Sequence, residues 1–333
     1  MHKTLSVIDL SAIEHNSVKV REMIGSRFFW AVVKADAYGH GAVEVSRRIE
    51  NIVDGFCVAI VDEGVQLRVC GITKPILVFA PPLDTDDAER MRRYNLIATV
   101  TDAHSAHLAR GCLYHIAVNT GMNRYGSFGK GLEDTLKNCD LSGLVGAYSH
   151  MYFAEDSIRC QNQLAYFKQA LRLIYARVGG TCDEGAGNKI QAHLSASGGI
   201  LRGEEYLLDG VRCGIMLYGY TPHGFKAEGL TPALKVYARR ACETEFLGDG
   251  VGYGIADRKY DRLYTYRLGY ADGFFRNVPL GEKTLCMDAF ISCENVPLLP
   301  VFTDANGYAE RAGTISYEVL CAVTARSERV YIG

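Results

Sequence analysis

The sequence predicts an α/β protein in which an N-terminal (β/α)8 barrel of the TIM type precedes a mostly β domain. Short apolar runs recur through the first part of the chain, at spacings that leave room for a helix after each run. From about residue 226 the segments become shorter, richer in turns and more aromatic. We therefore expect a barrel over residues 1–225 and a β domain over residues 226–333.

Eight apolar runs suit strands that are buried on both faces of a parallel sheet. They cover residues 28–34, 54–61, 74–80, 95–100, 113–118, 144–150, 190–195 and 213–219. Helical periodicity marks connections such as 42–50 and 163–178. An open doubly wound sheet is the alternative, but no Gly-x-Gly-x-x-Gly loop follows the first run, which argues against a dinucleotide-binding fold.

Two later features complete the expected organisation. The glycine-rich segment 179–190 is interpreted as an exposed barrel connection without chemistry. In the second domain, β-branched and aromatic residues dominate 262–275, 284–293, 318–325 and 329–333. These four segments are the expected strands of the β domain.

Composition excludes several classes of function. The 333 residues carry a net charge of −2, which does not suggest a nucleic-acid surface or a polybasic membrane anchor. No apolar run approaches the ~18 residues that cross a bilayer, and the N-terminus lacks a signal-peptide pattern. We expect a soluble, cytoplasmic protein with no nucleic-acid or membrane partner.

The 11 cysteines are scattered and odd in number, and several lie inside apolar runs. There is no Cys-x-x-Cys pair and no His-Glu-x-x-His motif. The sequence therefore favours neither a disulfide scaffold nor a metal site, and the cysteines read as small core residues in a reducing compartment.

The first apolar run ends on a lysine, in the stretch "FFWAVVKADAYGHG". Burying an ammonium group costs several kcal/mol unless the group is paired, neutralised or covalently used. One interpretation is that Lys34 extends to the surface at the strand end. The other is that Lys34 is a reactive amine with a lowered pKa, as a Schiff-base lysine requires.

Other polar residues lie at the predicted strands: His150 ends one, Ser197 follows one, and Arg212 opens the last. In a barrel, function collects on the face where the carboxyl ends of the strands gather. Taken alone, His150 suits a core histidine, Ser197 an ordinary loop and Arg212 a structural ion pair. Taken with Lys34, they suggest pyridoxal 5'-phosphate. The phosphate would take the Ser197 hydroxyl and backbone N–H groups near Gly214 and Ile215.

A resemblance to a known family supports this group of cofactor-binding residues. "AVVKADAYGHG" resembles the cofactor-lysine motif of alanine racemases. "NTGMNRYG", "HLSASGG", "VRCGIMLYG", "VGYG", "GYADGFFR", "CMD" and "SYEVLCAVTARSERVYIG" resemble other landmarks of that family in the same order, over nearly the whole chain. The resemblance implies interconversion of L- and D-alanine, with D-alanine supplying bacterial cell-wall peptides.

The resemblance also implies a mechanism with two bases on opposite faces of the substrate. Lys34 is the first base, and Tyr253 in "VGYG" is the second. A phenol has a pKa of about 10, so nearby cations must lower it, and His150 with Arg212 behind it are the expected source. In the family this tyrosine comes from the partner chain, which implies a homodimer with shared sites.

The remaining roles follow from the same resemblance. Tyr38 supports the phosphate, and Tyr317 lies at the cofactor as a bulky wall at the entrance. Arg212 faces the pyridine nitrogen and, having no acceptor to offer, keeps it unprotonated. Arg124 and the backbone near Met287 hold the substrate carboxylate. The partner chain also contributes Tyr270, Met287 and Asp288 to the site.

One departure from the family pattern concerns Arg124. Many members carry a lysine seven residues before this arginine, modified to a carbamate that orients it. Here that position is Ala117, and Asn119 replaces a commonly acidic residue. Arg124 is therefore expected to be held by a bound chloride or by another side chain.

Four alternatives remain open from the sequence. A related racemase could act on serine, because the Tyr317 hydroxyl offers a partner for the serine hydroxyl. A decarboxylase on the same architecture is disfavoured by "CMD" and "VGYG" and by the lack of its cysteine motif. A non-catalytic pyridoxal-phosphate carrier would resemble the barrel alone, and a sugar-metabolising barrel would bind no such cofactor.

Overall fold

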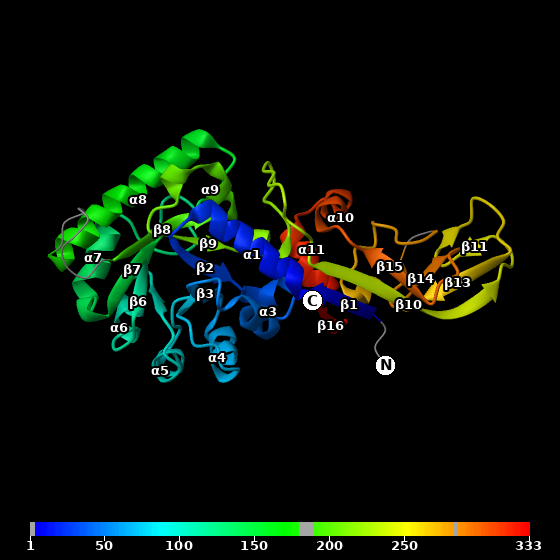
Figure 1. Ribbon diagram of the computed structural model, residues 1–333, viewed down its shortest axis with the longest axis horizontal. Helices are drawn as coiled ribbons and strands as arrows, with labels where there is room; N and C mark the ends of the chain where they lie inside the picture. The colour runs from blue at the N-terminus through cyan, green and yellow to red at the C-terminus, as the bar shows by residue number, and fades with distance from the viewer. Residues whose placement is uncertain (1–3, 180–189, 283–284) are drawn as a thin grey trace.

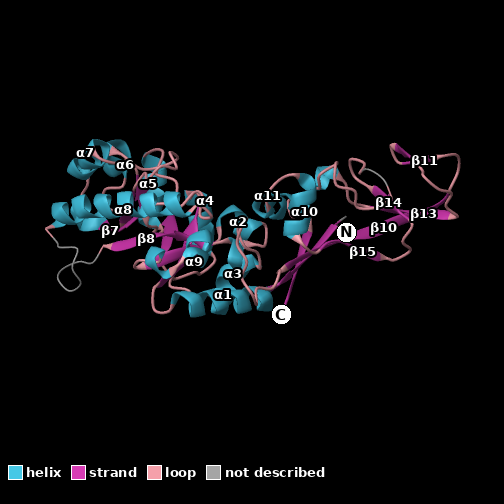
Figure 2. Ribbon diagram, turned by 90° about the horizontal axis from the view of Figure 1, so that it is seen from above, coloured by secondary structure: helices cyan, strands magenta, loops and turns pink. Residues whose placement is uncertain are grey.

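The computed structural model describes residues 4–179, 190–282 and 285–333. The molecule is elongated and has two lobes (Figure 1). The N-terminal lobe holds a ring of strands covered by helices, and the second lobe is rich in strands. Viewed from above, α10 (Ala305–Ala312) and α11 (Ser316–Val323) lie between the two lobes (Figure 2).

The first lobe is a parallel eight-stranded sheet with the order β4-β3-β2-β9-β8-β7-β6-β5. A bridge between Leu77 and Ile97 joins its two ends and closes the barrel. The strands are β2 (Phe28–Val32), β3 (Gly55–Val58), β4 (Ile76–Val78), β5 (Ala98–Val100), β6 (Tyr114–Ala117), β7 (Leu144–Tyr148), β8 (Gln191–Ala196) and β9 (Gly210–Cys213). The predicted barrel is confirmed.

Helices connect successive strands and cover the outside of the barrel, because their apolar sides pack on strands that are buried on both faces. They are α1 (Leu10–Ile24), α3 (Ala42–Ile49), α4 (Val61–Val69), α5 (Thr85–Arg93), α6 (Ala103–Leu108), α7 (Lys130–Asn138), α8 (Ser157–Val178) and α9 (Ser197–Arg202). The short element α2 (Lys34–Tyr38) instead lies at the mouth of the barrel. The helical periodicity at 42–50 and 163–178 is confirmed by α3 and α8.

The second lobe is built on a sheet with the order β14-β13-β10-β1-β16, and β15 also pairs with β10. Its strands are β1 (Thr4–Asp9), β10 (Leu234–Glu245), β13 (Arg262–Tyr266), β14 (Phe290–Ser292), β15 (Leu298–Phe302) and β16 (Glu328–Ile332). The chain thus begins in the second lobe before it enters the barrel, and the boundary predicted at residue 225 assigned β1 to the other lobe.

Two predicted strands are wrong in type or place. In the run 213–219 the strand ends at Cys213, because Gly214 turns the chain and Ile215–Tyr218 form a 3-10 helix, η3. The segment 318–325 lies mostly in helix α11, where Val319, Leu320 and Val323 recur at helical spacing and are buried. The glycine-rich segment 179–190 lies almost entirely outside the described residues.

The structure also bears on the expected free core cysteines and on the expected absence of a membrane-spanning segment. All ten described cysteines are free, and Cys57, Cys112, Cys160 and Cys213 are buried as expected. Cys242, Cys293 and Cys321 are exposed, so these three are not core residues. Among the residues that the structure describes, no helix combines the length and apolarity that a membrane span requires.

Candidate active site

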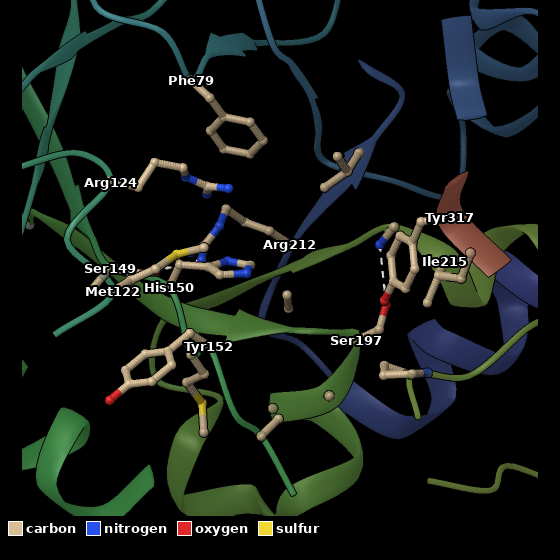
Figure 3. Close-up of a pocket in the computed structure, with 18 of the residues that line it drawn as sticks. Phe79, Met122, Arg124, Ser149, His150, Tyr152, Ser197, Arg212, Ile215 and Tyr317 are labelled. Carbon is tan, nitrogen blue, oxygen red and sulfur yellow. Dashed lines mark hydrogen bonds between the residues drawn. The ribbon is translucent and has the colours of Figure 1, made fainter. Parts of the chain in front are cut away.

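A cavity of about 610 Å³ opens at the carboxyl ends of the barrel strands, where barrel enzymes place their chemistry. Its lining brings together nine of the residues that the sequence analysis selected. These are Lys34, Tyr38, Arg124, His150, Ser197, Arg212, Gly214, Ile215 and Tyr317. Figure 3 shows the two ends of this cavity. Arg124, Arg212 and His150 lie at one end, and Ser197, Ile215 and Tyr317 lie at the other.

Lys34 lies two residues beyond the end of β2, and a left-handed turn follows it. Ala35, Asp36, Ala37 and Tyr38 all have φ between 51° and 55°, which is the left-handed region. Left-handed helical conformation costs L-residues roughly 1–2 kcal/mol each, so this turn stores several kcal/mol of backbone strain. Such strain persists only where the surrounding structure over-determines it.

Three polar contacts hold the strained turn. The Asp36 carboxylate accepts from the Ala42 N–H at 2.7 Å and pairs with Arg329 of β16. Glu63 of α4 accepts from the Ala35 N–H at 2.7 Å. The turn therefore places Lys34 and Tyr38 in fixed positions at the mouth of the barrel.

The amine of Lys34 lies in apolar surroundings. Its Nζ is 6.0 Å from the centre of the Phe79 ring and has no hydrogen-bond partner among the described residues. Burial and then the positive charge of Arg124 lower the pKa of Lys34. A larger fraction of the amine is neutral at pH 7 than in an ordinary lysine, which is the property required of a nucleophilic amine.

Arg212 is 2% exposed and is held by neutral acceptors. Its Nη1 donates to the Nδ1 and the carbonyl oxygen of His193, at 2.7 and 2.9 Å. Its Nη2 donates to the carbonyl oxygens of Ser149 and Leu194, at 2.5 and 3.0 Å. A guanidinium carries five N–H groups. The Nε–H is thus left without a partner in the described part of the chain, and it can donate to a ligand.

His150 is uncharged at neutral pH. Burial, followed by the positive charges of Arg212, Arg124 and Lys34, lowers its pKa to about 3. Burial lowers the pKa of Arg212 only to about 10, so this group stays protonated. The expected cation beside a second base is therefore Arg212 and not His150, because a histidine among three cations releases its proton.

The other end of the cavity is a small polar cradle. Ser197 Oγ accepts from the Gly214 N–H at 3.3 Å. Tyr38 is 7% exposed, and its hydroxyl has no hydrogen-bond partner among the described residues. A Cβ at position 214 would lie 2.5 Å from that hydroxyl, so only glycine allows this approach. Hydroxyl and N–H donors that converge in this way suit a phosphate.

Arg124 lines the cavity from the loop after β6 and is exposed in the single chain. Apart from the Tyr125 ring, 5.7 Å from its guanidinium carbon, no partner of its side chain is found among the described residues. Ala117 lines the same part of the cavity and offers no charge. Asn119 accepts from the N–H groups of Gly121 and Asn123, so it shapes the loop and does not contact Arg124.

Four selected residues lie away from this cavity, on the second lobe. Tyr253 is 78% exposed in the turn of the hairpin β11 (Gly250–Val251) and β12 (Gly254–Ile255). Figure 1 shows this hairpin at the end of the molecule far from the barrel. Tyr270 and Met287 are also exposed, and the Tyr270 and Ala271 N–H groups bond to the carbonyls of Cys286 and Met287.

The turn that carries Tyr253 lies against the loop that contains Cys286 and Met287 and precedes β14. A Cβ on Gly252 would be 3.3 Å from the sulfur of Cys286, next in the chain to Met287 and Asp288. The four residues therefore lie in neighbouring segments of the second lobe, and none of them lines the cavity of its own chain.

Sequence reasoning missed the residues behind Arg212. Because His193 Nδ1 accepts from Arg212, its Nε2 carries the proton and donates to His115 Nδ1 at 2.8 Å. The ring of Tyr148 lies 5.2 Å from the guanidinium carbon. His115 and His193 both occur inside predicted strands, and a polar residue inside an apolar strand is the signal that could have identified them.

Comparison with known proteins gives a consistent result. The family model described as "Alanine racemase, N-terminal domain" matches residues 8–222. The alanine racemase of Clostridium perfringens is 32% identical over 97% of this chain and 94% of its own length. That of Cutibacterium acnes is also 32% identical, over 98% of this chain and 97% of its own length.

Solved structures agree with the sequence relatives. The biosynthetic alanine racemase of Pseudomonas aeruginosa superposes with a TM-score of 0.85 at 27% identity, covering 100% of both chains. The alanine racemase of Bacillus anthracis with bound L-Ala-P superposes with a TM-score of 0.86 at 28% identity, covering 100% of this chain and 96% of the other. Both lobes of the molecule are thus shared with these structures.

Proposed function

This chain belongs to the alanine racemase family and is an isomerase, and we propose that it interconverts L- and D-alanine with pyridoxal 5'-phosphate held at Lys34. The D-alanine would supply bacterial cell-wall peptides. The observation that carries the proposal is the free donor set of the cavity. The Lys34 amine, the Tyr38 hydroxyl and the Arg212 Nε–H all face one space and lack partners among the described residues.

The cavity fits the cofactor on chemical grounds. Lys34 would bind its aldehyde carbon, and Tyr38, Ser197 and the N–H groups of Gly214 and Ile215 would hold its phosphate. The Nε–H of Arg212 would donate to the pyridine nitrogen, since the other four N–H groups of that side chain are already used. Tyr317, whose ring centre is 5.9 Å from that of Tyr38, would wall the same end.

Racemisation requires a proton to leave one face of the α-carbon and another to arrive on the opposite face. When bound, pyridoxal phosphate supplies the electron sink that makes the α-proton acidic enough to remove. Lys34 can take or return this proton on its own face, because burial and Arg124 already favour its neutral form. No residue that lines the cavity from this chain is assigned to the opposite face.

Tyr253 of a second copy of the chain is the base proposed for the opposite face. A residue that is 78% exposed in the single chain, near the exposed Tyr270 and Met287, suits an interface between copies. The charge of Arg212 would favour the phenolate once the two copies meet. His150, being neutral, would offer a hydrogen bond to the phenol oxygen instead of a charge.

The substrate carboxylate is assigned to Arg124. The backbone near Met287 of the second copy would complete this contact, with Tyr270 and Asp288 beside it. An arginine without a carboxylate partner among the described residues keeps its full charge for the ligand. The proposed homodimer would thus carry two sites, each built from both copies.

Co-expression of Lys34→Ala and Tyr253→Phe tests the shared site. Each variant alone should be nearly inactive in chiral analysis of L-alanine turnover. The wild type should turn over L-serine more slowly than L-alanine. If the copies assort randomly, co-expression should restore about a quarter of wild-type activity, because half of the dimers are hybrids with one intact site each.

The same variants separate the two bases. Lys34→Ala should lose the absorbance of the covalently held cofactor, whereas Tyr253→Phe should keep it. In D₂O, Tyr253→Phe should slow exchange of the α-proton from one enantiomer far more than from the other. Equal slowing from both enantiomers, or no recovery on co-expression of two folded variants, would contradict the assignment.

A further inference from the structure

A glutamine on the outer helix α8 links the loops that follow β6 and β7. Gln163 is 2% exposed, so its amide needs partners inside the protein. Its Nε2 donates to Thr120 Oγ1 at 3.0 Å and to the carbonyl oxygen of His150 at 2.9 Å. Its Oε1 accepts from the Tyr152 N–H at 3.4 Å. Both amide protons thus donate hydrogen bonds to the two loops, which contribute to the lining of the cavity.

Thr120 passes the connection on to the end of β7. Because its hydroxyl accepts from Gln163, its own proton is available for Ser149 Oγ, 2.7 Å away. The carbonyl oxygen of Ser149 in turn accepts from Arg212 Nη2. Thr120 and Ser149 are 3% and 4% exposed, so the whole chain of bonds is shielded from water.

Thr120 also anchors the loop that carries Arg124. The base of this loop is closed by the Asn119 N–H, which donates to the carbonyl oxygen of Ser127 at 3.1 Å. Inside the loop, Asn119 Nδ2 donates to Asn123 Oδ1 at 3.0 Å, and Asn123 adopts a φ of 57°. The loop is therefore internally braced, and Thr120 joins it to the barrel.

Arg124 itself has no side chain that fixes its direction among the described residues, and Ala117 provides none. The orientation of the Arg124 guanidinium then depends on the position of the loop that carries it. We propose that Gln163 is a positioning residue for Arg124, which sets the affinity of the cavity for carboxylates by holding Thr120 against Ser149. The inference rests on the proposed function, because it assigns Arg124 to the carboxylate of an amino-acid substrate.

Gln163→Met tests this inference, since methionine keeps the length of the side chain and removes both donors. Isothermal titration calorimetry of the holoenzyme with propionate, a carboxylate without an amino group, measures the contact with Arg124 without turnover. The dissociation constant should rise about tenfold, within the 10²-fold that a 1 Å misplacement can cost. The KM for alanine should rise by a similar factor while kcat stays within about threefold, as expected when the ground state and the transition state lose the same binding.

Three further variants keep the test decisive. Thr120→Val should reproduce the weaker propionate binding, and Thr120→Ser, which keeps the hydroxyl, should restore it. Gln161→Met, on the exposed side of the same helix, should bind propionate like the wild type. If Gln163→Met and Thr120→Val fold but bind propionate normally, or if Gln161→Met weakens binding equally, the inference is wrong.

This design separates the inference from the proposed function. A wild type that binds propionate but does not racemise alanine would refute the proposed function, and the comparison of variants would still measure the role of Gln163. A wild type that does not bind propionate would overturn the inference, because Arg124 would then not be a carboxylate site.

Discussion

Gly214→Ala is the sharpest test of the phosphate cradle. The added Cβ would lie 2.5 Å from the Tyr38 hydroxyl oxygen, whereas ordinary contact begins at 3.4 Å. The hydroxyl must therefore retreat by roughly 0.9 Å, which is enough to break a hydrogen bond of normal length. Tyr38 cannot simply turn aside, because its ring packs 4.9 Å from that of Tyr218 and 5.9 Å from that of Tyr317.

The expected effect is a loss of cofactor affinity. A hydrogen bond to a charged acceptor contributes about 1.5–3 kcal/mol, so the dissociation constant of pyridoxal phosphate should rise about 10- to 150-fold. Titration of the apo-protein, followed by cofactor absorbance, measures this constant directly. Gly131→Ala is the matched control, because its Cβ would meet Ser127 Cβ at an ordinary 3.5 Å.

A double-mutant cycle assigns the effect to Tyr38. In a Tyr38→Phe background the hydroxyl is already missing, so Gly214→Ala should weaken cofactor binding much less than it does in the wild type. If Gly214→Ala binds the cofactor within twofold of the wild type, or weakens it equally in both backgrounds, the reasoning about the cradle is wrong.

Two further predictions concern the stability of the apo-protein, measured by urea unfolding. The folded chain lowers the pKa of Lys34 below the ordinary 10.5. Between the two pKa values the unfolded chain therefore binds more protons than the folded chain. The free energy of unfolding of the wild type should rise with pH over this window. Lys34→Met should be more stable by about 1 kcal/mol at pH 7, and this advantage should shrink toward pH 10.5; a constant advantage would refute the linkage. Ala35→Gly, in the exposed left-handed turn, should raise stability by about 1 kcal/mol because it relieves strain. Ala165→Gly, exposed in the right-handed helix α8, should lower it by about 1 kcal/mol, and a loss of stability in both variants would count against the strain.

The sequence predicts the barrel well because its strands are continuous apolar runs, a pattern that burial on both faces imposes directly. It fails where tertiary context overrides local preference. The β-branched residues of 318–325 suggest a strand, yet α11 places Val319, Leu320 and Val323 on one buried side. β1 was assigned to the barrel, because nothing in a six-residue strand tells which sheet it will join.

The cavity residues could be predicted because each lies at or next to the end of a predicted barrel strand, and the fold brings the strands together. Lys34, His150, Ser197 and Arg212 were identified in this way. The left-handed turn after Lys34 could not be predicted, since two of its four residues are alanines, which disfavour positive φ, and a stabilising partner, Arg329, lies far away in sequence. Gln163 was missed because a polar residue on a helix normally faces water.

The partners of Arg212 explain how the cavity keeps a buried positive charge beside His150. A carboxylate beside this guanidinium would cancel its charge, whereas His193 and the backbone carbonyls satisfy four N–H groups and leave the charge intact. After burial, that charge is the largest cause of the lowered pKa of His150, and the charge of Arg124 acts in the same direction on Lys34. The neutral partners thus let Arg212 keep its charge and favour the neutral form of His150, which a salt bridge at the same position would weaken.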